Sequence, residues 1–371
     1  MRERGRACHK GRDQHPSGEA RMTTKTNSGR FFEDFAIGEV IRHATPRTVT
    51  AGDASLYAAL YGTRFAVQSS DVFAKALGYR HAPVDDLLVF HIVFGKTVPD
   101  VSLNAVANLG YAAARFLAPV YPGDTLRAVS EVIGLKENSN RRTGVVYVRS
   151  TGFNQDGVEV LDYVRWVMVH KRDPEAVIAE EHVPTLPRVV ATDALGDACP
   201  ALDPAAYDDV LAGSLDRWDD YEVGEQIDHV DGMTVEEAEH MLATRLYQNT
   251  AKVHFDQLAQ ASSRFGRRLI YGGHVISLAR ALSFNGLANA FHVAAINGGR
   301  HVAPLFAGDT VYAWSEILDK QPLPGRDDVG GLRVRMVATK NKPCRDFPLK
   351  DGEEYDPAVI LDLDLWVLAP R

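Results

Sequence analysis

The chain has 371 residues, of which 45% are hydrophobic and 24% charged, and its formal net charge is −8. These values are ordinary for a globular protein and exclude collagen-like, coiled-coil and largely disordered chains. The acidic balance argues against a nucleic-acid partner. The sequence contains no run of 18 apolar residues, so we expect no membrane span. The cysteines, Cys8, Cys199 and Cys344, are few, odd in number and far apart, which favours a reducing, cytoplasmic location.

Residues 1–30 are polar and basic and lack the apolar stretch of a signal peptide. We expect them to form a disordered leader outside the folded domains. Met22 is a second candidate for the natural start of the chain.

An internal repeat organises the rest of the sequence. Residues 32–70 align with 218–256 at a constant offset of 186, and 11 of the 39 positions are identical. Residues 115–132 align with 300–317 at an offset of 185, with nine of 18 identical. A period this long is not that of a solenoid and indicates a duplicated domain. The expected organisation is an N-terminal domain at 31–175, a Pro-rich linker at 176–212 and a C-terminal domain at 213–371.

In the first copy the pattern predicts a helix over 50–62, an irregular loop, and then an apolar helix over 85–98. Alternating, Val-rich runs predict strands over 125–137, 143–154 and 158–172, with a hairpin turn at Asn154–Gly157.

The second copy repeats this plan. It predicts helices over 234–248 and 272–284 and strands over 310–320, 332–340 and 358–369. Thr234 and Glu237 have the spacing of a capping box at the start of the first helix. One apolar helix and an antiparallel sheet in each copy give an α+β fold.

Two familiar site patterns are incomplete. Gly95-Lys96-Thr97 resembles the end of a phosphate-binding loop, but the required earlier glycine is Phe90, and the three residues end an apolar helix. The thirteen histidines show no pair at metal-ligand spacing supported by carboxylates, so we expect neither a nucleotide-phosphate loop nor a metal.

The strongest local feature is YQNTAKVHFD, residues 247–256, where Asn249 and His254 lie five apart after a helix. The first copy has Thr63 and Gln68 at the equivalent positions. Because only the second copy keeps an imidazole, we expect it to carry the chemistry while the first completes the pocket. The alternative is a surface histidine in a loop.

The second feature is Gly272-Gly273 at the start of an apolar helix. Free N–H groups at a helix N-terminus stabilise a developing oxyanion, and Gly273 lets a carbonyl approach closely. The first copy has Asp85-Asp86 nearby, which would repel an oxyanion. The alternative is a glycine needed for close packing.

These residues resemble the MaoC-type hydratases, whose (R)-specific enoyl-CoA hydratases carry D-x-N-P-L-H-x-D before a helix that begins V-H-G-M. His254 and Asp256 match the H-x-D, Gly273 matches the glycine that supplies the oxyanion N–H, and FAGDT at 306–310 matches a following segment. The resemblance covers nearly the whole chain. It implies two tandem hot-dog domains, each a long central helix wrapped by an antiparallel sheet, packed as a pseudo-dimer.

Segments 82–98, 247–256 and 270–291 resemble, more narrowly, the mesaconyl-CoA hydratase branch of that family. This implies reversible hydration of a short branched 2-enoyl-CoA, namely mesaconyl-CoA to β-methylmalyl-CoA. It further implies a small CoA thioester as ligand, no cofactor, and a homodimer of two-domain chains as one option.

The chain departs from the family motif at Asn249, which stands where the first acid is expected. An amide does not exchange protons as a carboxylate does, so His254 is expected to perform most of the proton transfer. Asn249 is expected to position water and to tolerate the substrate's free carboxylate. Lys252 and Arg280 are candidate substrate-binding cations by sequence proximity alone, with solvated charges as the alternative.

Two other functions remain open. Thioester hydrolysis, which hot-dog proteins also perform, usually requires a carboxylate to activate water, and Asp256 is the one available near His254. A non-catalytic acyl-CoA-binding protein is the third possibility, although retention of the imidazole in one copy argues against it.

Overall fold

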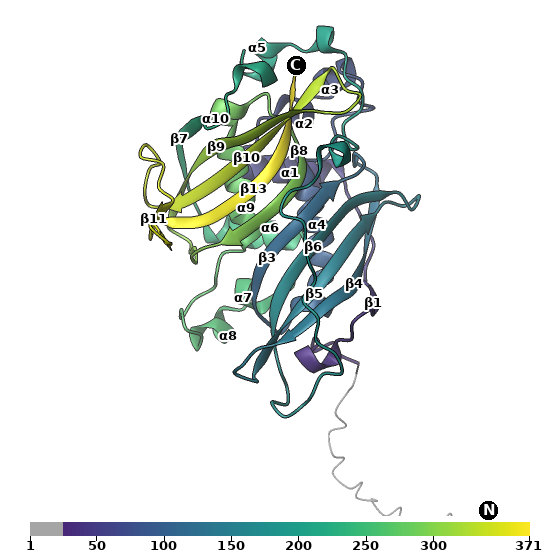
Figure 1. Cartoon of the computed structure of the whole chain (residues 1–371), viewed down its shortest axis with the longest axis vertical. Coiled ribbons are helices and arrows are strands. Elements are labelled where there is room, and N and C mark those ends of the chain that lie inside the picture. The colour runs from purple at the N-terminus through teal and green to yellow at the C-terminus, as the bar shows by residue number, and fades with distance from the viewer. Residues whose placement is uncertain (1–24) are drawn as a thin grey trace, which may run out of the picture.

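In the computed structural model, which describes residues 25–371, an 11-stranded antiparallel sheet runs through the molecule (Figure 1). Its main path has the order β1-β4-β5-β6-β3-β8-β13-β10-β9-β7, and β2 pairs with β4. The strands are β1 (Val40–Arg42), β2 (Arg47–Thr48), β3 (Ala105–Phe116), β4 (Thr125–Glu137), β5 (Thr143–Phe153), β6 (Glu159–His170), β7 (Gln226–Thr234), β8 (His292–His301), β9 (Thr310–Pro322), β10 (Val329–Lys340) and β13 (Val359–Pro370). A separate hairpin consists of β11 (Lys350–Asp351) and β12 (Glu354–Tyr355).

The two halves of this sheet have the same topology. The first is ordered β1-β4-β5-β6-β3 and the second β7-β9-β10-β13-β8, and the two are joined where β3 pairs with β8. At this junction Tyr111 lies opposite Gly299 and Ala114 opposite Ile296. The predicted α+β fold of two hot-dog units is confirmed, whereas the exact domain boundaries stay a prediction.

One face of the sheet is covered by helices, with α4 (Asp86–Thr97) packed on the first half and α9 (Gly272–Leu282) on the second (Figure 1). Every residue of α4 from Leu87 to Thr97 is buried. A helix that is apolar all round is expected where both the sheet and other helices cover it. The remaining helices are α1 (Ala51–Tyr61), α2 (Ala66–Ser69), α3 (Asp71–Ala76), α5 (Asp209–Ala212), α6 (Glu237–Leu246), α7 (Lys252–Phe255), α8 (Gln257–Ala261) and α10 (Phe284–Leu287).

The predicted capping box of the second copy is wrong. Helix α6 begins at Glu237, and Glu236 at its N-cap makes no side-chain capping bond. Thr234 is instead the last residue of β7, and its Oγ1 lies 2.8 Å from Oγ1 of Thr310 on β9. Strand pairing therefore uses the hydroxyl that the spacing assigned to the helix. In the first copy Thr50 and Asp53 form the capping box at the start of α1.

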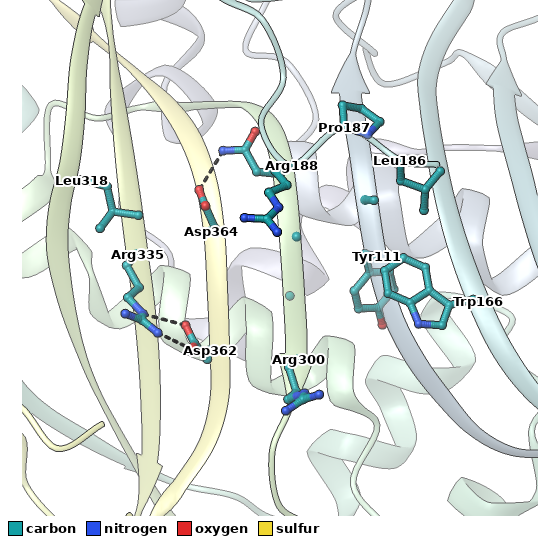
Figure 2. A pocket seen from close by; sticks show the side chains of 14 residues that line it. Tyr111, Trp166, Leu186, Pro187, Arg188, Arg300, Leu318, Arg335, Asp362 and Asp364 are labelled. Atoms are coloured by element: carbon teal, nitrogen blue, oxygen red, sulfur yellow. Dashed lines mark hydrogen bonds and ion pairs between the residues drawn. The ribbon is translucent and has the colours of Figure 1, made fainter. Parts of the chain in front are cut away.

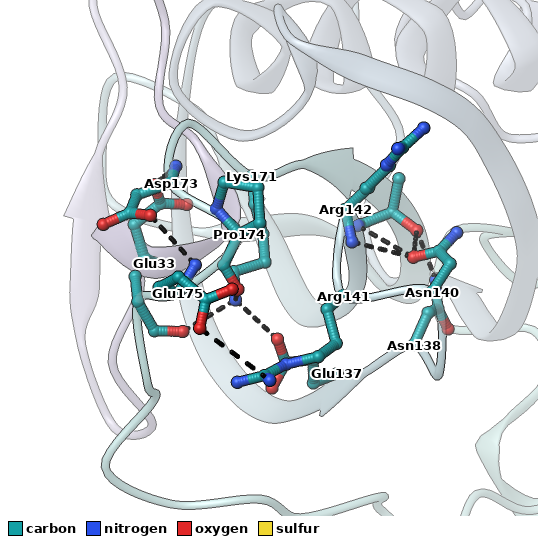
Figure 3. A network of polar contacts seen from close by, with 12 residues as sticks. Glu33, Glu137, Asn138, Asn140, Arg141, Arg142, Lys171, Asp173, Pro174 and Glu175 are labelled. Carbon is teal, nitrogen blue, oxygen red and sulfur yellow. Dashed lines mark hydrogen bonds and ion pairs between the residues drawn. The ribbon is translucent and has the colours of Figure 1, made fainter.

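The expected leader, residues 1–30, enters the described part of the chain only at 25–30, and Met22 lies outside it. Arg30 forms an ion pair with Glu39 at 2.8 Å. Just beyond, Glu33 accepts hydrogen bonds from the backbone N–H groups of Arg172 and Asp173 (Figure 3). The segment entering the first domain is thus fixed to the end of β6.

Within the predicted linker, residues 176–212, the stretch from His182 to Val190 hydrogen-bonds to strands of both halves of the sheet. His182 bridges to Leu135 of β4, and further on the Val190 N–H donates to Oδ1 of Asn297 on β8 at 2.8 Å. The indole of Trp366 on β13 donates to the Val190 carbonyl. The segment therefore crosses from the first half to the second by hydrogen bonding to both.

Within residues 25–371, the helices are all too short or too polar to cross a bilayer. Cys199 and Cys344 are buried and unpaired, and Cys8 lies outside the described residues.

Candidate active site

The loop after α6 holds Asn249 in a buried position. Gln248 has a positive φ of 54°, which turns the chain sharply at the end of the helix. Asn249 is 2% exposed, and its Oδ1 accepts a hydrogen bond from the Ala251 N–H at 3.0 Å. Within residues 25–371 its NH₂ group has no hydrogen-bond acceptor, so this group is available to a water or a ligand.

His254 on α7 is 8% exposed, so the alternative of a surface histidine is wrong. Its Nδ1 lies 2.8 Å from the Leu269 carbonyl. A carbonyl only accepts, so Nδ1 carries the proton, and in the neutral ring Nε2 is an acceptor. Burial lowers the pKa of His254 to about 4, against the opposing effect of the Leu269 carbonyl. Near neutral pH the ring therefore presents a basic Nε2.

Helix α9 begins without a side-chain cap. Tyr271 occupies its N-cap position but makes no capping bond, and the N–H groups of Gly272 and Gly273 have no acceptor among residues 25–371. A Cβ at position 273 would lie 2.3 Å from the Tyr271 ring and 2.5 Å from the His91 ring. Gly273 is therefore required for close packing and also lies at an uncapped helix N-terminus, so the two interpretations of this glycine are compatible.

The equivalent end of α4 is closed by its own carboxylates. Asp85 accepts from the Leu87 N–H at 2.9 Å. Asp86 accepts from the Val293 N–H and lies 2.9 Å from Nδ1 of His292. Since burial and the Asp86 charge raise the pKa of Asp85 to about 6, this end already holds acidic groups. An oxyanion would be stabilised at α9 and repelled at α4.

Helix α4 brings Asn249 and Gly273 to the same place. A Cβ on Gly95 would lie 3.3 Å from the backbone nitrogen of Asn249. His91 lies one turn earlier on the same face of α4, and its ring contacts Gly273. His254 reaches this place through Tyr271, whose ring centroid is 5.5 Å from that of His254. Three residues expected from the sequence thus gather around one side of α4.

Gly95 explains the incomplete phosphate-loop pattern. A Cβ there would lie 1.9 Å from the Tyr247 carbonyl oxygen, so only glycine lets the 247–249 loop approach α4 this closely. Lys96 donates to the Thr45 carbonyl and lies 3.5 Å from Oε1 of Gln248. The first domain therefore supports the loop that carries Asn249.

Equivalent positions of the repeat meet between the two domains. The hydroxyls of Tyr61 and Tyr247 are 2.6 Å apart, and Nε2 of His91 lies 2.9 Å from Oγ of Ser277. Each pair is separated by 186 residues, the offset of the repeat. Tyr61 also bonds to Nδ1 of His274 at 2.8 Å. The alignment of residues 32–70 with 218–256 matches Tyr61 with Tyr247, but an alignment does not predict that the two residues touch.

Lys252 and Arg280, the two cations expected from proximity, make no side-chain hydrogen bond to Asn249, His254 or Gly273, and their role in substrate binding stays a prediction. Lys252 is exposed and has no polar partner among the described residues. Arg280 is buried rather than solvated and lies seven residues, about 10 Å, along α9 from Gly273. It stacks on Phe65 at 3.7 Å and bonds to the Ala290 carbonyl. Asp256 caps α8 by accepting from the Ala259 N–H.

A cavity of about 510 Å³ opens on the opposite face of the sheet, where β3 and β8 meet (Figure 2). Its lining includes Arg188, Arg300 and the Arg335–Asp362 ion pair, but not Asn249, His254 or Gly273. This hollow is therefore separate from the candidate active site. Among residues 25–371, no group of three or more His, Cys, Asp or Glu side chains is placed to hold a metal ion.

Replacing Gly95 by Ala should displace the 247–249 loop, because the new methyl group would overlap the Tyr247 carbonyl. We expect kcat to fall by at least about 10-fold, since a displacement of about 1 Å can cost 100-fold. Gly52→Ala in α1 is the matched control, because a Cβ there meets nothing closer than 3.4 Å. Equal effects of the two substitutions on kcat would contradict the role of Gly95.

The buried histidines predict a loss of stability in acid. Burial lowers the pKa of His91 and His274 to about 3 and of His301 to about 4, so these rings stay neutral in the folded state. The unfolded chain protonates them below pH 6.5, costing about 1.4 kcal/mol per histidine per pH unit. Urea unfolding should therefore give full stability above pH 6.5 and a steep decline toward pH 4.5. A flat profile over this range would contradict the assignment.

Comparison with known proteins identifies relatives over almost the full length. Residues 17–352 match the profile of the family described as mesaconyl-CoA hydratase. A β-methylmalyl-CoA dehydratase of Chloroflexus aurantiacus is 63% identical over 351 residues, covering 94% of this chain and 99% of the relative. A mesaconyl-CoA hydratase of Cereibacter sphaeroides is 60% identical, covering 94% of this chain and 100% of the relative.

Solved structures agree with the fold. The crystal structure of a MaoC domain protein dehydratase from Chloroflexus aurantiacus superposes with a TM-score of 0.92, at 63% identity, covering 94% of this chain and 99% of that one. A Mycobacterium tuberculosis protein described as a double hotdog fold superposes with a TM-score of 0.71, at 26% identity, covering 92% and 98%.

Proposed function

This chain belongs to the mesaconyl-CoA hydratase family, and we propose that it catalyses the reversible hydration of mesaconyl-CoA to β-methylmalyl-CoA. The observation that carries the proposal is a neutral, buried imidazole with a free Nε2 close to an uncapped helix N-terminus. Hydration of an α,β-unsaturated thioester needs these two elements, a base for water and a site for the enolate oxygen.

In the proposed reaction, Nε2 of His254 takes a proton from water as the water oxygen bonds to the β-carbon of the substrate. Electrons of the double bond move toward the thioester carbonyl, whose oxygen accepts a hydrogen bond from the Gly273 N–H. The imidazolium then returns the proton to the α-carbon. The Leu269 carbonyl holds the Nδ1 proton throughout, and the NH₂ of Asn249 contacts the water or the substrate.

The ligand is then a small CoA thioester. A homodimer of chains and a cytoplasmic location are further proposals, the second resting on the few, unpaired cysteines. Incubation with mesaconyl-CoA tests the reaction class. Loss of enoyl absorbance supports hydration, release of free thiol would indicate thioester hydrolysis, and neither change would indicate a binding protein.

Substitution of His254 by Ala should lower kcat by roughly 100- to 10,000-fold, the usual contribution of general acid–base catalysis. Gln68→Ala, at the equivalent position of the first copy, is the control and should leave kcat nearly unchanged. Equal effects of the two substitutions would contradict a division of labour between the copies.

In the wild type, kcat/KM for hydration should stay level down to about pH 5 and then decline, because protonation removes the Nε2 lone pair and the pKa of His254 is about 4.

Asn249→Asp tests why the family's carboxylate is missing. Mesaconyl-CoA carries a free carboxylate beside the reacting carbon, and a second buried negative charge there would be costly. The substitution should therefore lower kcat/KM more for mesaconyl-CoA than for the uncharged crotonyl-CoA. An equal loss on both substrates would mean that Asn249 acts only through the water.

A further inference from the structure

Arg165 is a fully buried cation on β6, with 0% of its surface exposed. Its Nη2 donates to Oγ1 of Thr97 at 2.7 Å and to Oγ of Ser102 at 3.3 Å. Its Nε is buried without any hydrogen-bond partner. None of the carboxylates in residues 25–371 lies within 4.0 Å of it, although buried arginines are normally paired with an acid.

A second unpartnered donor lies beside it. The hydroxyl of Tyr163, two residues earlier on the same face of β6, is buried and forms no hydrogen bond within 3.5 Å. Burial raises the pKa of Tyr163, and the Arg165 charge and the hydroxyls of Ser150 and Thr97 oppose this effect. Among residues 25–371 the cluster therefore contains a buried guanidinium N–H and a buried phenol O–H that have no hydrogen-bond partner within 3.5 Å.

The rings of Phe94 and Tyr271 lie between this cluster and His254 of the candidate active site. The Arg165 guanidinium stacks on Phe94 of α4 at 4.3 Å, and the Phe94 ring centroid is 5.8 Å from that of Tyr271. Tyr271 in turn contacts His254 and Gly273. Burial lowers the pKa of Arg165 from its usual value.

The duplication shows that these polar residues belong to one copy alone. Residues 161–170, LDYVRWVMVH, align with 361–370, LDLDLWVLAP, matching Leu161 with Leu361 and Trp166 with Trp366. Leu363 and Leu365, each 2% exposed, then occupy the positions of Tyr163 and Arg165. An apolar pair is thus compatible with this place in the fold, so packing alone does not explain the arginine.

We infer that Arg165, together with Tyr163, binds the free carboxylate of the substrate, an inference that rests on the proposed function. In mesaconyl-CoA this carboxylate is attached to the carbon that water attacks, so its partner has to lie within the same buried region. Arg165 supplies the missing positive charge, and the substrate supplies the acceptor for Nε and for the Tyr163 hydroxyl. Specificity for a charged enoyl-CoA then comes from the first domain and the base from the second.

The test compares mesaconyl-CoA with crotonyl-CoA in Arg165→Gln, Arg165→Lys and Tyr163→Phe. Arg165→Gln should lower kcat/KM for mesaconyl-CoA by about 100-fold, mostly through KM, as for loss of one partner of a buried charge pair. The value for crotonyl-CoA should change less than about 5-fold. Arg165→Lys should recover part of the loss, because it keeps the charge but not the planar geometry. Arg149→Gln, which removes the partner of Asp162 on the other face of the sheet, is the matched control.

Tyr163→Phe guards against a merely structural effect. Its hydroxyl has no partner, so the melting temperature should not fall, whereas KM for mesaconyl-CoA should rise by about 10-fold, the usual effect of losing one hydrogen bond to a charged group. Equal changes for both substrates in Tyr163→Phe and Arg165→Lys would overturn the inference, even if Arg165→Gln failed to fold.

Binding to the His254→Ala protein separates this inference from the proposed function. If the wild type did not hydrate mesaconyl-CoA, the proposed reaction would be wrong. Calorimetric titration would then still show whether the binding preference for mesaconyl-CoA over crotonyl-CoA depends on Arg165. A preference that survives Arg165→Gln would overturn the inference whatever the reaction.

Discussion

The pairing of β3 with β8 is the constraint on which the rest of the structure depends. It joins two sheets of identical topology edge to edge and thereby sets α4 of the first domain against the loops of the second. The contacts that shape the site follow from this placement, because Gly95 receives the 247–249 loop and His91 packs on Gly273. The hydroxyl pair of Tyr61 and Tyr247 lies at the same junction. The candidate site residues of the second domain are therefore packed against a helix of the first.

Duplication allowed the two copies to use equivalent positions differently. In the first copy Asp85 caps α4 by accepting from the Leu87 N–H, and the carboxylates of Asp85 and Asp86 at this end stabilise the helix and close it to anions. In the second copy α9 has no cap, and the stabilisation that a cap would provide is given up. An uncapped end is a cost to folding unless a ligand meets it, which is why its presence beside His254 indicates function.

Local pattern and the internal repeat predicted a duplicated α+β fold correctly, and the family resemblance supplied its hot-dog topology. Local pattern did not identify β3 and β8, whose Ala and Gly residues have low strand propensity. Those small residues are required by packing: a Cβ on Gly110 would meet Trp166 at 2.3 Å, and one on Gly299 would meet Leu363 at 2.5 Å. Proximity along the chain suggested Lys252 and Arg280, whereas the unpaired buried cation, Arg165, comes from a strand of the other copy.

Electrostatics links the proposed base, the amide and the arginine. The histidines around the site are neutral because burial lowers each pKa, so they add no charge to a region of low dielectric constant. A substrate with its own carboxylate brings one negative charge into this region. The single positive charge of Arg165 can balance that one negative charge. An aspartate at 249 would add an unbalanced anion, whereas Asn249 preserves neutrality. Under the proposed function, the amide at 249 and the arginine at 165 meet the same charge requirement, and the substrate's carboxylate accounts for the departure from the family motif.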